Sequence, residues 1–310
     1  MKIGLSLTTA YPRDEPAVER FQQIVQQVEA ARDHGFHSVW VGDHHVTPHV
    51  YYQSVPTIAR LSAHAGNMQI GPFLLLPLYP PVLLAEQMAT LDVITGGRLT
   101  LMVALGWQPE AYAAFGIPWK ERVRRFEEGV EVLRVLFAKD PADYLGRFSH
   151  FEGLSFHPKP VHRRIPLWVG ASAEPAIRRA ARLGDAWIIG PLSSPEAVHA
   201  QMRIYKAALE ECGRAREITE FPIRRDVCIA EDRATALQIA EPQLRTGYRG
   251  VKGNPLDVLI VGGPQEFVET LEELRALGTS HVLIRCMVQT QEHILRAIQI
   301  IGEQVIPKVS

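Results

Sequence analysis

Apolar residues along this chain alternate between short continuous runs and longer stretches with helical spacing. Short runs rich in Val, Ile and Leu predict buried strands, and apolar residues repeating every three or four positions predict helices packed against them. Eight strand-then-helix units in 310 residues favour a (β/α)8 TIM barrel over an open sheet. The predicted strands are Lys2–Leu7, Ser38–Val41, Gln69–Leu76, Arg98–Val103, Ile165–Val169, Ala186–Ile189, Pro222–Ile229 and His281–Cys286.

No linker or repeat divides this pattern, so residues 1–310 are expected to form one domain. Two stretches are longer than the connections that a minimal barrel needs. Residues 140–164 carry Phe148, Phe151 and Phe156 among glycines, which predicts an ordered insertion near the carboxyl-end mouth of the barrel. Within it, 145–159 is expected to cover the barrel beside the mouth. The second stretch, 246–264, is rich in glycine and is expected to be a loop.

Composition narrows the class of protein. Hydrophobic residues make up 46% of the chain and charged residues 22%, as in ordinary globular proteins. A formal net charge of −1 offers no positive surplus for nucleic acid or anionic lipid, and no apolar run has the length of a transmembrane helix or signal peptide. Neither nucleic acid nor a membrane is therefore expected as a partner.

The three cysteines, Cys212, Cys228 and Cys286, are an odd number without CxxC spacing. Each stands in an apolar or helical segment that is typical of a reduced protein interior. This usage indicates a cytoplasmic protein with free thiols.

A polar triplet, Asp43-His44-His45, follows the second predicted strand directly. The carboxyl ends of parallel strands are where α/β enzymes place their chemistry, and imidazoles transfer protons near neutral pH. We therefore expect His44, His45 and Asp43 to be catalytic. The alternative is structural, with one ring capping a carbonyl and the other filling a polar gap. No metal is expected, because no third ligand follows at zinc-like spacing.

Small residues follow the fifth predicted strand. Gly170, Ala171 and Ser172 precede a helical stretch that starts near Ala176. Small residues let a ligand approach the backbone, Ser172 can cap the helix, and the N-terminus of a helix binds phosphate. A plain helix cap without a ligand explains the pattern equally well.

The third and fourth predicted strands also carry unusual residues. Gly106 and Trp107 follow the fourth strand, so the indole is expected at the mouth, where it either walls a planar ligand or seals the barrel. Pro72 lies inside the third strand, which indicates a bulge or an unusual peptide geometry, although packing alone also explains it.

Taken in this order, the segments resemble the bacterial luciferase-like monooxygenase superfamily, whose members include flavin monooxygenases and deazaflavin-dependent dehydrogenases. The resemblance covers nearly the whole chain. It is carried by Asp43-His44-His45, by Leu76-Pro77-Leu78 through Gln87, by Gly96-Gly97-Arg98, by Gly106-Trp107 with Phe115-Gly116, and by Trp168 through Ala181 with Gly184-Asp185-Ala186-Trp187.

This resemblance implies a TIM barrel that binds FMN or coenzyme F-420, a deazaflavin, at its carboxyl-end mouth. It implies a phosphate held by the backbone after the fifth strand, with Arg178 or Arg179 adding charge. It also implies a non-proline cis peptide bond in a strand bulge near Pro72 to Leu74, behind the flavin ring. The expected cofactor contacts are Gly170, Ala171, Ser172, Gly106, Trp107, Phe73 and Leu74.

The acid-His-His form resembles the FMN-using members, whereas many deazaflavin-dependent members have an aliphatic residue in place of His45. We therefore expect an FMN-using monooxygenase that acts on a small organic substrate, with a separate flavin reductase as partner and a second copy of itself in a homodimer. The alternatives are an F-420-dependent dehydrogenase or reductase, a non-catalytic flavin-binding relative, and a barrel lyase. A lyase would need a strand-end lysine for a Schiff base, which the predicted strands lack.

Overall fold

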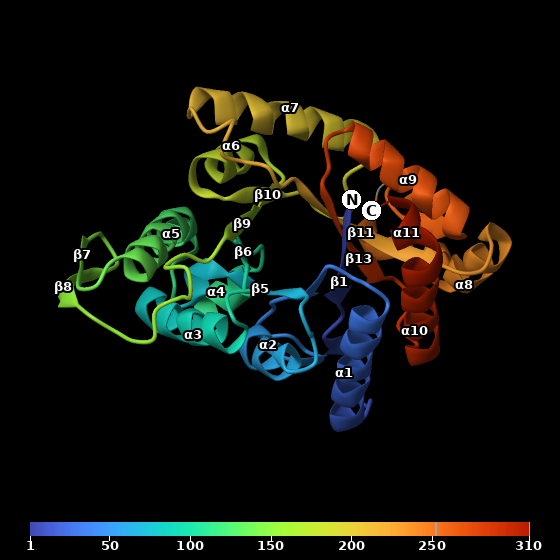
Figure 1. Ribbon diagram of the computed structural model, residues 1–310, viewed down its shortest axis with the longest axis horizontal. Coiled ribbons are helices and arrows are strands. Elements are labelled where there is room, and N and C mark those ends of the chain that lie inside the picture. Colours follow the sequence, from blue (N-terminus) through green and yellow to red (C-terminus); the bar gives the residue numbers. More distant parts are fainter. Residues whose placement is uncertain (252, 310) are drawn as a thin grey trace.

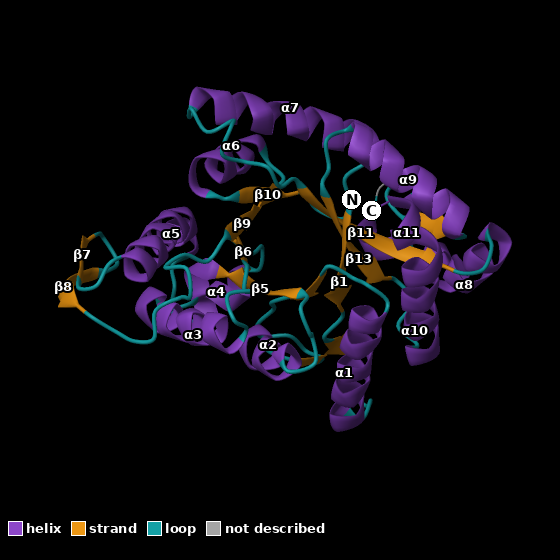
Figure 2. Ribbon diagram, viewed as in Figure 1, coloured by secondary structure: helices purple, strands orange, loops and turns teal. Residues whose placement is uncertain are grey.

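The computed structural model describes residues 1–251 and 253–309. Residue 252 falls in the predicted glycine-rich loop 246–264, so that part of the prediction lies outside the described residues. Within the described residues, nine parallel strands form one curled sheet in the order β10-β9-β6-β5-β3-β1-β13-β11-β12 (Figures 1 and 2). They are β1 (Lys2–Leu7), β3 (Ser38–Val41), β5 (Gln69–Leu75), β6 (Leu101–Ala104), β9 (Leu167–Gly170), β10 (Ala186–Ile188), β11 (Pro222–Ile229), β12 (Ile260–Gly262) and β13 (His281–Cys286).

Two backbone hydrogen bonds also join β10 to β11, which are not neighbours in the ladder. Ile189 N donates to Pro222 O at 3.1 Å, and Arg224 N donates to Ile189 O at 3.1 Å. The curl of the sheet therefore brings these two strands side by side.

Helices surround the outer face of the curled sheet (Figure 2). They are α1 (Ala17–Asp33), α2 (Ser54–Ser62), α3 (Pro81–Ile94), α4 (Pro109–Ala114), α5 (Arg122–Ala138), α6 (Glu174–Leu183), α7 (Pro195–Glu211), α8 (Arg233–Arg245), α9 (Pro264–Ala276), α10 (Gln291–Ile300) and α11 (Ile306–Val309). Two small antiparallel pairs lie outside the curled sheet: β2 (Ala10–Tyr11) with β4 (Val50–Tyr51), and β7 (Ala142–Leu145) with β8 (His150–Leu154).

A strand is present at each of the eight predicted positions, although some ends differ. The largest difference is in β6, which begins at Leu101 rather than Arg98. The sequence pattern did not predict β12, which lies inside the predicted loop 246–264 and pairs with β11 through Val227 and Ile260. Its apolar run is only a few residues long, follows Asp257 and ends at Gly262-Gly263, so the pattern gave little signal.

Two layers of apolar side chains stabilise the sheet. On its inner face, the indoles of Trp40 and Trp168 stack with centroids 4.7 Å apart, and Leu283 packs beside them. Gly71 makes room for this stack, because a Cβ there would lie 2.3 Å from the Trp40 ring. On the outer face, alternate residues such as Val39 and Val41 enter the larger core beneath the helices.

The insertion packs outside α5 rather than beside the mouth, so the predicted position is wrong. Figure 1 shows α5 between the sheet and the β7–β8 hairpin. At the hairpin tip, the Glu128 carboxylate of α5 accepts the backbone N–H groups of Arg147, Phe148 and Ser149 at 2.9, 2.8 and 2.6 Å. Lys159 Nζ donates to two carbonyls at the end of the same helix at 2.9 Å. These charge-assisted bonds fix the hairpin to α5.

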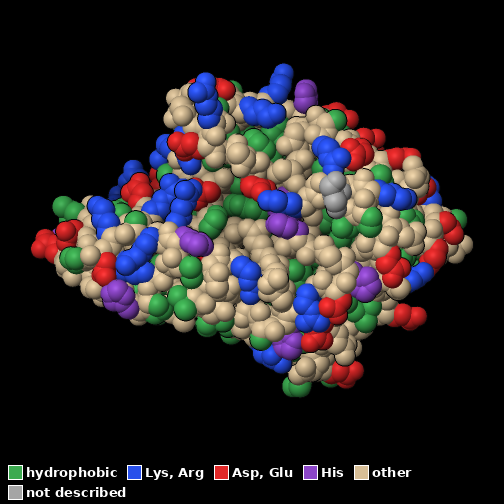
Figure 3. Space-filling model, viewed as in Figure 1, with side chains coloured by type: hydrophobic (Ala, Val, Ile, Leu, Met, Phe, Trp, Pro, Cys, Tyr) green, Lys and Arg blue, Asp and Glu red, His purple; other side chains and the backbone are tan. Residues whose placement is uncertain are grey.

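Surface charge is mixed on the face shown in Figure 3, where basic and acidic side chains are interspersed. Among residues 1–251 and 253–309, no helix combines the length and the apolar character needed to span a membrane. All three cysteines are free; Cys228 and Cys286 are buried, but Cys212 is exposed just after α7, contrary to the predicted interior position.

Candidate active site

Asp43 joins the carboxyl ends of two neighbouring strands. It follows β3 and is buried, and its Oδ2 accepts the backbone N–H of Leu75 at the end of β5 at 2.9 Å. The same oxygen accepts the Tyr79 hydroxyl at 3.0 Å and contacts His45 Nε2 at 3.3 Å. Burial and the adjacent Asp43 charge raise the pKa of Tyr79 far above its usual value, so the phenol stays a donor. Asp43 therefore positions its neighbours.

His45 is enclosed on its side of the mouth. Its side chain is 10% exposed, and its ring lies edge-to-face against Tyr79 and Phe115, with centroids 5.8 and 5.0 Å away. With Asp43 on its Nε2, this ring resembles a structural imidazole more than a proton donor to a ligand. The predicted catalytic role of His45 stays a prediction, and its contacts favour positioning.

His44 lies among polar and aromatic groups from two other segments, β4 and the loop after β6. Its Nδ1 is 3.1 Å from Gln108 Oε1, and its ring lies edge-to-face with Tyr51 and Trp107 at 5.5 and 6.2 Å. An amide oxygen only accepts hydrogen bonds, so Nδ1 carries the proton in this contact. The neutral ring then has Nε2 as its basic nitrogen, which suits general acid–base chemistry. Gln108 was not found from the sequence.

Tyr51 and Trp107 shape the same region. The Tyr51 hydroxyl reaches the end of β3, where a Cβ on Gly42 would lie 2.9 Å from it. Burial raises the pKa of Tyr51, so its hydroxyl is protonated at neutral pH. Trp107 is 71% exposed beside the His44 ring, so it does not seal the sheet. An exposed indole next to a histidine is a surface on which a planar ligand can stack.

A buried charge cluster that the sequence analysis missed lies on β11 and β13. Asp226 is fully buried, and Arg285 reaches both of its oxygens, with Nε to Oδ1 at 2.9 Å and Nη2 to Oδ2 at 2.7 Å. Tyr248 donates to Oδ2 at 2.7 Å and Arg249 Nη1 at 2.9 Å. Although burial opposes ionisation, Arg285 and Arg224 hold the pKa of Asp226 well below its usual value.

Three consecutive charged residues, Arg224-Arg225-Asp226, inside an apolar predicted strand were the signal for this cluster. Strand alternation sends Arg225 to the opposite face from Arg224 and Asp226. There its guanidinium donates to the backbone carbonyls of Pro191 and Ser193 at 3.3 and 3.0 Å. Arg225 thus holds the loop that follows β10.

The loop after β9 forms a helix start without a side-chain cap. Ala173, not Ser172, is the N-cap of α6, and it offers no side-chain acceptor, so the predicted capping by Ser172 is wrong. Trp187 Nε1 donates to Ala171 O at 2.8 Å, which fixes the loop. At Gly170 a Cβ would lie 3.2 Å from the Phe73 ring, so glycine allows that ring to approach.

Comparison with known proteins identifies the family. A family-level sequence profile described as luciferase-like monooxygenase matches residues 1–276. The chain belongs to the luciferase-like monooxygenase family. The structure superposes on a monooxygenase from Streptomyces bottropensis with a TM-score of 0.88 and 23% identity, covering 100% of both chains, which supports the fold.

Curated relatives in this family use two different cofactors. The chain is 27% identical to the FMNH2-dependent dimethylsulfone monooxygenase of Pseudomonas putida, over 83% of this chain and 78% of that protein. It is 24% identical to the F-420-dependent glucose-6-phosphate dehydrogenase of Nakamurella multipartita, over 93% of this chain and 92% of that protein. The family is therefore one of flavin-dependent or F-420-dependent oxidoreductases.

Two details implied by the family resemblance differ in this structure. The cis peptide bonds among the described residues are at Asp140-Pro141 and His157-Pro158, not near Pro72 to Leu74. That strand stays in register with both neighbours, pairing Val41 with Pro72 and Phe73 with Met102, so it has no bulge there.

The two expected cofactor contacts on this strand lie on opposite faces. Leu74 is fully buried in the outer core, so its side chain does not reach the mouth, whereas Phe73 packs on the inner face.

The two arginines expected to add charge near the phosphate loop are paired elsewhere. Arg178 forms ion pairs with Glu174 and Glu211, and Arg179 pairs with Glu127 on α5 at 3.0 Å. Both guanidinium groups are therefore engaged in ion pairs with glutamates at the helical surface.

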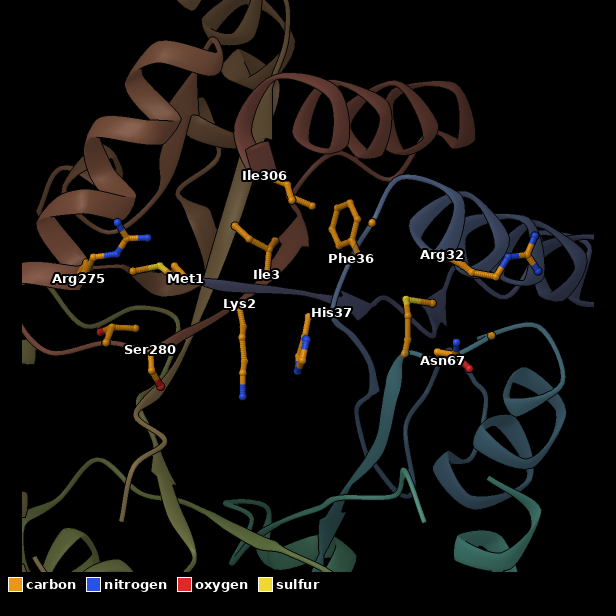
Figure 4. Close-up of a pocket in the computed structure, with 14 residues that line it drawn as sticks. Met1, Lys2, Ile3, Arg32, Phe36, His37, Asn67, Arg275, Ser280 and Ile306 are labelled. Atoms are coloured by element: carbon orange, nitrogen blue, oxygen red, sulfur yellow. The ribbon is translucent and has the colours of Figure 1, made fainter. Parts of the chain in front are cut away.

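A cavity of about 990 Å³ lies at the opposite end of the sheet from His44. It is lined by residues at the amino ends of strands, including Lys2 of β1 and His37 just before β3, which point to the same side in Figure 4. Its cations already have acidic partners: Lys2 pairs with Glu220, and Arg275 with Glu272 at 2.7 Å. Cavity size alone therefore does not locate the chemistry of this protein.

The carboxyl ends of the strands instead carry buried polar atoms without partners. Among the described residues, Thr8 Oγ1 after β1 and Asp43 Oδ1 after β3 are buried without hydrogen bonds, as is Arg224 Nε inside β11. Buried polar atoms without partners cost free energy, so Thr8 and Asp43 suit a polar ligand at this end of the sheet. No group of His, Cys, Asp or Glu within 1–251 and 253–309 could hold a metal ion.

Proposed function

We propose that this protein is an FMN-using monooxygenase that acts on a small organic substrate at the carboxyl ends of its parallel strands. The observation that carries the proposal is His44, held at that end by Gln108 and flanked by Tyr51 and exposed Trp107. The 27% identical FMNH2-dependent relative supports FMN as the cofactor. The dependence of that relative on reduced flavin also supports a separate flavin reductase as the partner. A homodimer remains part of the proposal.

A second candidate uses coenzyme F-420 for hydride transfer at the same site. The F-420-dependent relative, which aligns over 93% of this chain, favours it. The residues around His44 suit either cofactor, so binding measurements are needed to separate them.

We also infer that the curled sheet closes as the (β/α)8 barrel that the sequence predicts. The hydrogen bonds between Ile189 and β11 support closure between β10 and β11. In such a barrel His44, Trp107 and Gly170 would surround one mouth, since each follows or ends a different strand.

The cofactor would be held mainly by backbone. Gly170, Ala171 and Ser172 precede α6, whose first turn has no side-chain acceptor at its cap, so its N–H groups suit a phosphate. Trp107 offers a face for the ring system. When bound, reduced FMN would supply the electrons for oxygen activation, and F-420 would supply a hydride.

The chain's own side chains would handle protons and water. His44 Nε2 would exchange a proton with the reacting substrate, while Gln108 keeps the proton on Nδ1. Asp43 fixes the ends of β3 and β5 on which His44 depends. Trp107 and Phe115 would exclude water when a ligand lies against them.

Anaerobic titration of the purified protein with reduced FMN and with F-420 tests the proposal. We expect one site per chain and a lower dissociation constant for reduced FMN. Tighter binding of F-420 would select the second candidate, and no binding of either would contradict both.

The position of the phosphate is tested by Ser172→Asp. A carboxylate in this loop would repel the phosphate, so the affinity for FMN should fall at least tenfold while the affinity for riboflavin changes little. Gln201→Asp is a matched control: Gln201 lies on α7 rather than in the loop, donates to the Ser172 carbonyl at 3.2 Å and accepts the Ser193 hydroxyl at 3.5 Å. Unchanged FMN affinity in Ser172→Asp would move the phosphate site elsewhere.

A further inference from the structure

The charge cluster on β11 and β13 is unbalanced. Arg224, Arg249 and Arg285 all lie within 3.7 Å of the Asp226 carboxylate. Three guanidinium groups and one carboxylate leave two positive charges without a negative partner in the cluster. An excess of this kind in a partly buried region attracts an anion.

Arg224 carries the largest unmet hydrogen-bonding capacity in the cluster. Its closest carboxylate contact is Nη2 to Asp226 Oδ1 at 3.7 Å, too long for a hydrogen bond. Within the described part of the chain its guanidinium donates no hydrogen bond, and its Nε is buried without a partner. The side chain is only 18% exposed. Burial lowers the pKa of Arg224 to about 10, which still leaves it charged at neutral pH.

Arg224 points to the inner face of the sheet. It pairs in register with Leu283 of β13, and Leu283 packs against the inner indoles of Trp40 and Trp168. Paired residues on adjacent strands share a face, so Arg224 shares the inner one. Farther along the strands, Asp226 pairs with Arg285 on the same face.

Tyr51 connects this cluster to the His44 site. The ring of Tyr51 contacts His44, with centroids 5.5 Å apart. The same phenol is near enough to Asp43, Arg224 and Arg285 for their charges to act on its pKa. Tyr51 therefore neighbours both the unsatisfied guanidinium and the proposed proton-transfer residue.

We propose that Arg224 binds an anionic group of the substrate, so that the enzyme acts on small organic acids such as carboxylates, sulfonates or phosphate esters. A tetrahedral or planar anion would accept hydrogen bonds from the forked N–H groups of Arg224 and would also offset the excess positive charge of the cluster. The substrate's reacting carbon would then extend past Tyr51 toward His44. The catalytic part of this inference rests on the proposed function, whereas the anion site does not.

Binding of inorganic sulfate and of methanesulfonate to the cofactor-free protein tests the site. At constant ionic strength, both anions should raise the melting temperature above that in chloride and give saturable binding by calorimetry. Arg224→Met should weaken this binding at least tenfold, and Arg224→Lys, which keeps the charge but loses the fork, should weaken it less. Arg203→Met, an exposed substitution on α7, is the control and should bind as wild type.

Two results would overturn the anion site: wild-type protein that does not distinguish sulfate from chloride, or Arg224→Lys and Arg224→Met variants that bind sulfate as wild type does. If Arg224→Met does not fold, the measurements on wild type and Arg224→Lys still decide whether Arg224 binds the anion.

The anion could also come from the cofactor's phosphate, and a second measurement separates the sources. Substrate recognition predicts that Arg224→Lys keeps the wild-type preference for FMN over riboflavin. Loss of that preference would assign Arg224 to the cofactor and overturn the substrate proposal. If no variant binds FMN or F-420, the proposed function fails, but the sulfate result still reports on Arg224.

Discussion

His44 and His45 are neighbours in the chain, yet their rings have different surroundings. His45 is held by Asp43 and enclosed by Tyr79 and Phe115, whereas His44 contacts Gln108 and the exposed Trp107. Adjacent residues in a loop point in different directions, so one can support the structure while the other meets the ligand.

Replacement of His44 by alanine should lower turnover about 10²–10⁴-fold, the range for loss of a proton-transfer group. Since His44 lies at the sheet end and outside the core, the melting temperature should change little. The measurement is steady-state kinetics with the cofactor identified by titration, beside thermal unfolding. Gln108→Ala should produce a smaller loss because it only orients the ring. Wild-type turnover in His44→Ala would make His44 structural.

Val46 has a strained backbone next to these histidines. Its φ is 54°, a left-handed conformation that is costly for a β-branched residue, and its side chain is 62% exposed. Asn tolerates this conformation, so Val46→Asn should raise the free energy of unfolding by about 1 kcal/mol. Chemical denaturation measures the change. Val46→Ala keeps a Cβ, so it should raise the free energy of unfolding by less. A Val46→Asn variant that is less stable than wild type would contradict the proposed backbone strain.

At the scale of elements, the β7–β8 hairpin shows how one buried interaction positions a segment. Aromatic residues at 148, 151 and 156 indicated that the insertion packs against something, but the partner is α5. Three backbone N–H groups at the tip share a single carboxylate, that of Glu128. The hairpin is thereby kept on the outside of the helical layer.

Glu128→Ala should loosen the hairpin tip without changing the active site. Loss of charge-assisted hydrogen bonds worth about 1.5–3 kcal/mol should make the amides of Arg147, Phe148 and Ser149 exchange at least tenfold faster. Hydrogen exchange measures this directly. Glu131→Ala is the matched control, because Glu131 accepts only the Tyr144 hydroxyl at 2.8 Å and does not reach the tip. Equal exchange in both variants would show that apolar packing alone holds the tip.

At the scale of the whole molecule, Asp226 connects distant parts of the chain. Its carboxylate on β11 binds Arg285 of β13 and both Tyr248 and Arg249, which lie beyond α8. A single buried carboxylate therefore joins two strands and a connecting segment around the charge cluster.

Asp226→Asn should destabilise the fold by about 3–5 kcal/mol at pH 7, because three cations lose their only shared carboxylate. The pKa of Asp226 is held below its unfolded value of 3.8, so its contribution is fully present above about pH 4. It is lost only as the pH falls through the lower pKa of the folded state. The stability gap between wild type and variant should therefore stay constant from pH 7 to about pH 5, by denaturant unfolding.

Exposed Asp14 provides the control for this experiment, and Asp14→Asn should follow the wild-type profile. A gap that closes already between pH 7 and pH 5 would mean that Asp226 titrates near its ordinary range and is not stabilised by the arginines.

The sequence by itself determined eight of the nine strands of the curled sheet and the place of Asp43-His44-His45 after β3. Both follow from local information: strand and helix periodicity repeats over a few residues, and a polar triplet after an apolar run marks a strand end. The family resemblance rested on the same local segments, and the family profile over residues 1–276 confirms it.

Only the tertiary structure decided which side chains meet. His44 and Gln108 are 64 positions apart, and Asp226 and Arg285 are 59 apart. The hairpin's attachment to α5, the enclosure of His45 and the unmet donors of Arg224 likewise depend on distant partners. Such contacts arise from how the sheet curls and which faces its strands present, and no local pattern in the chain encodes that geometry.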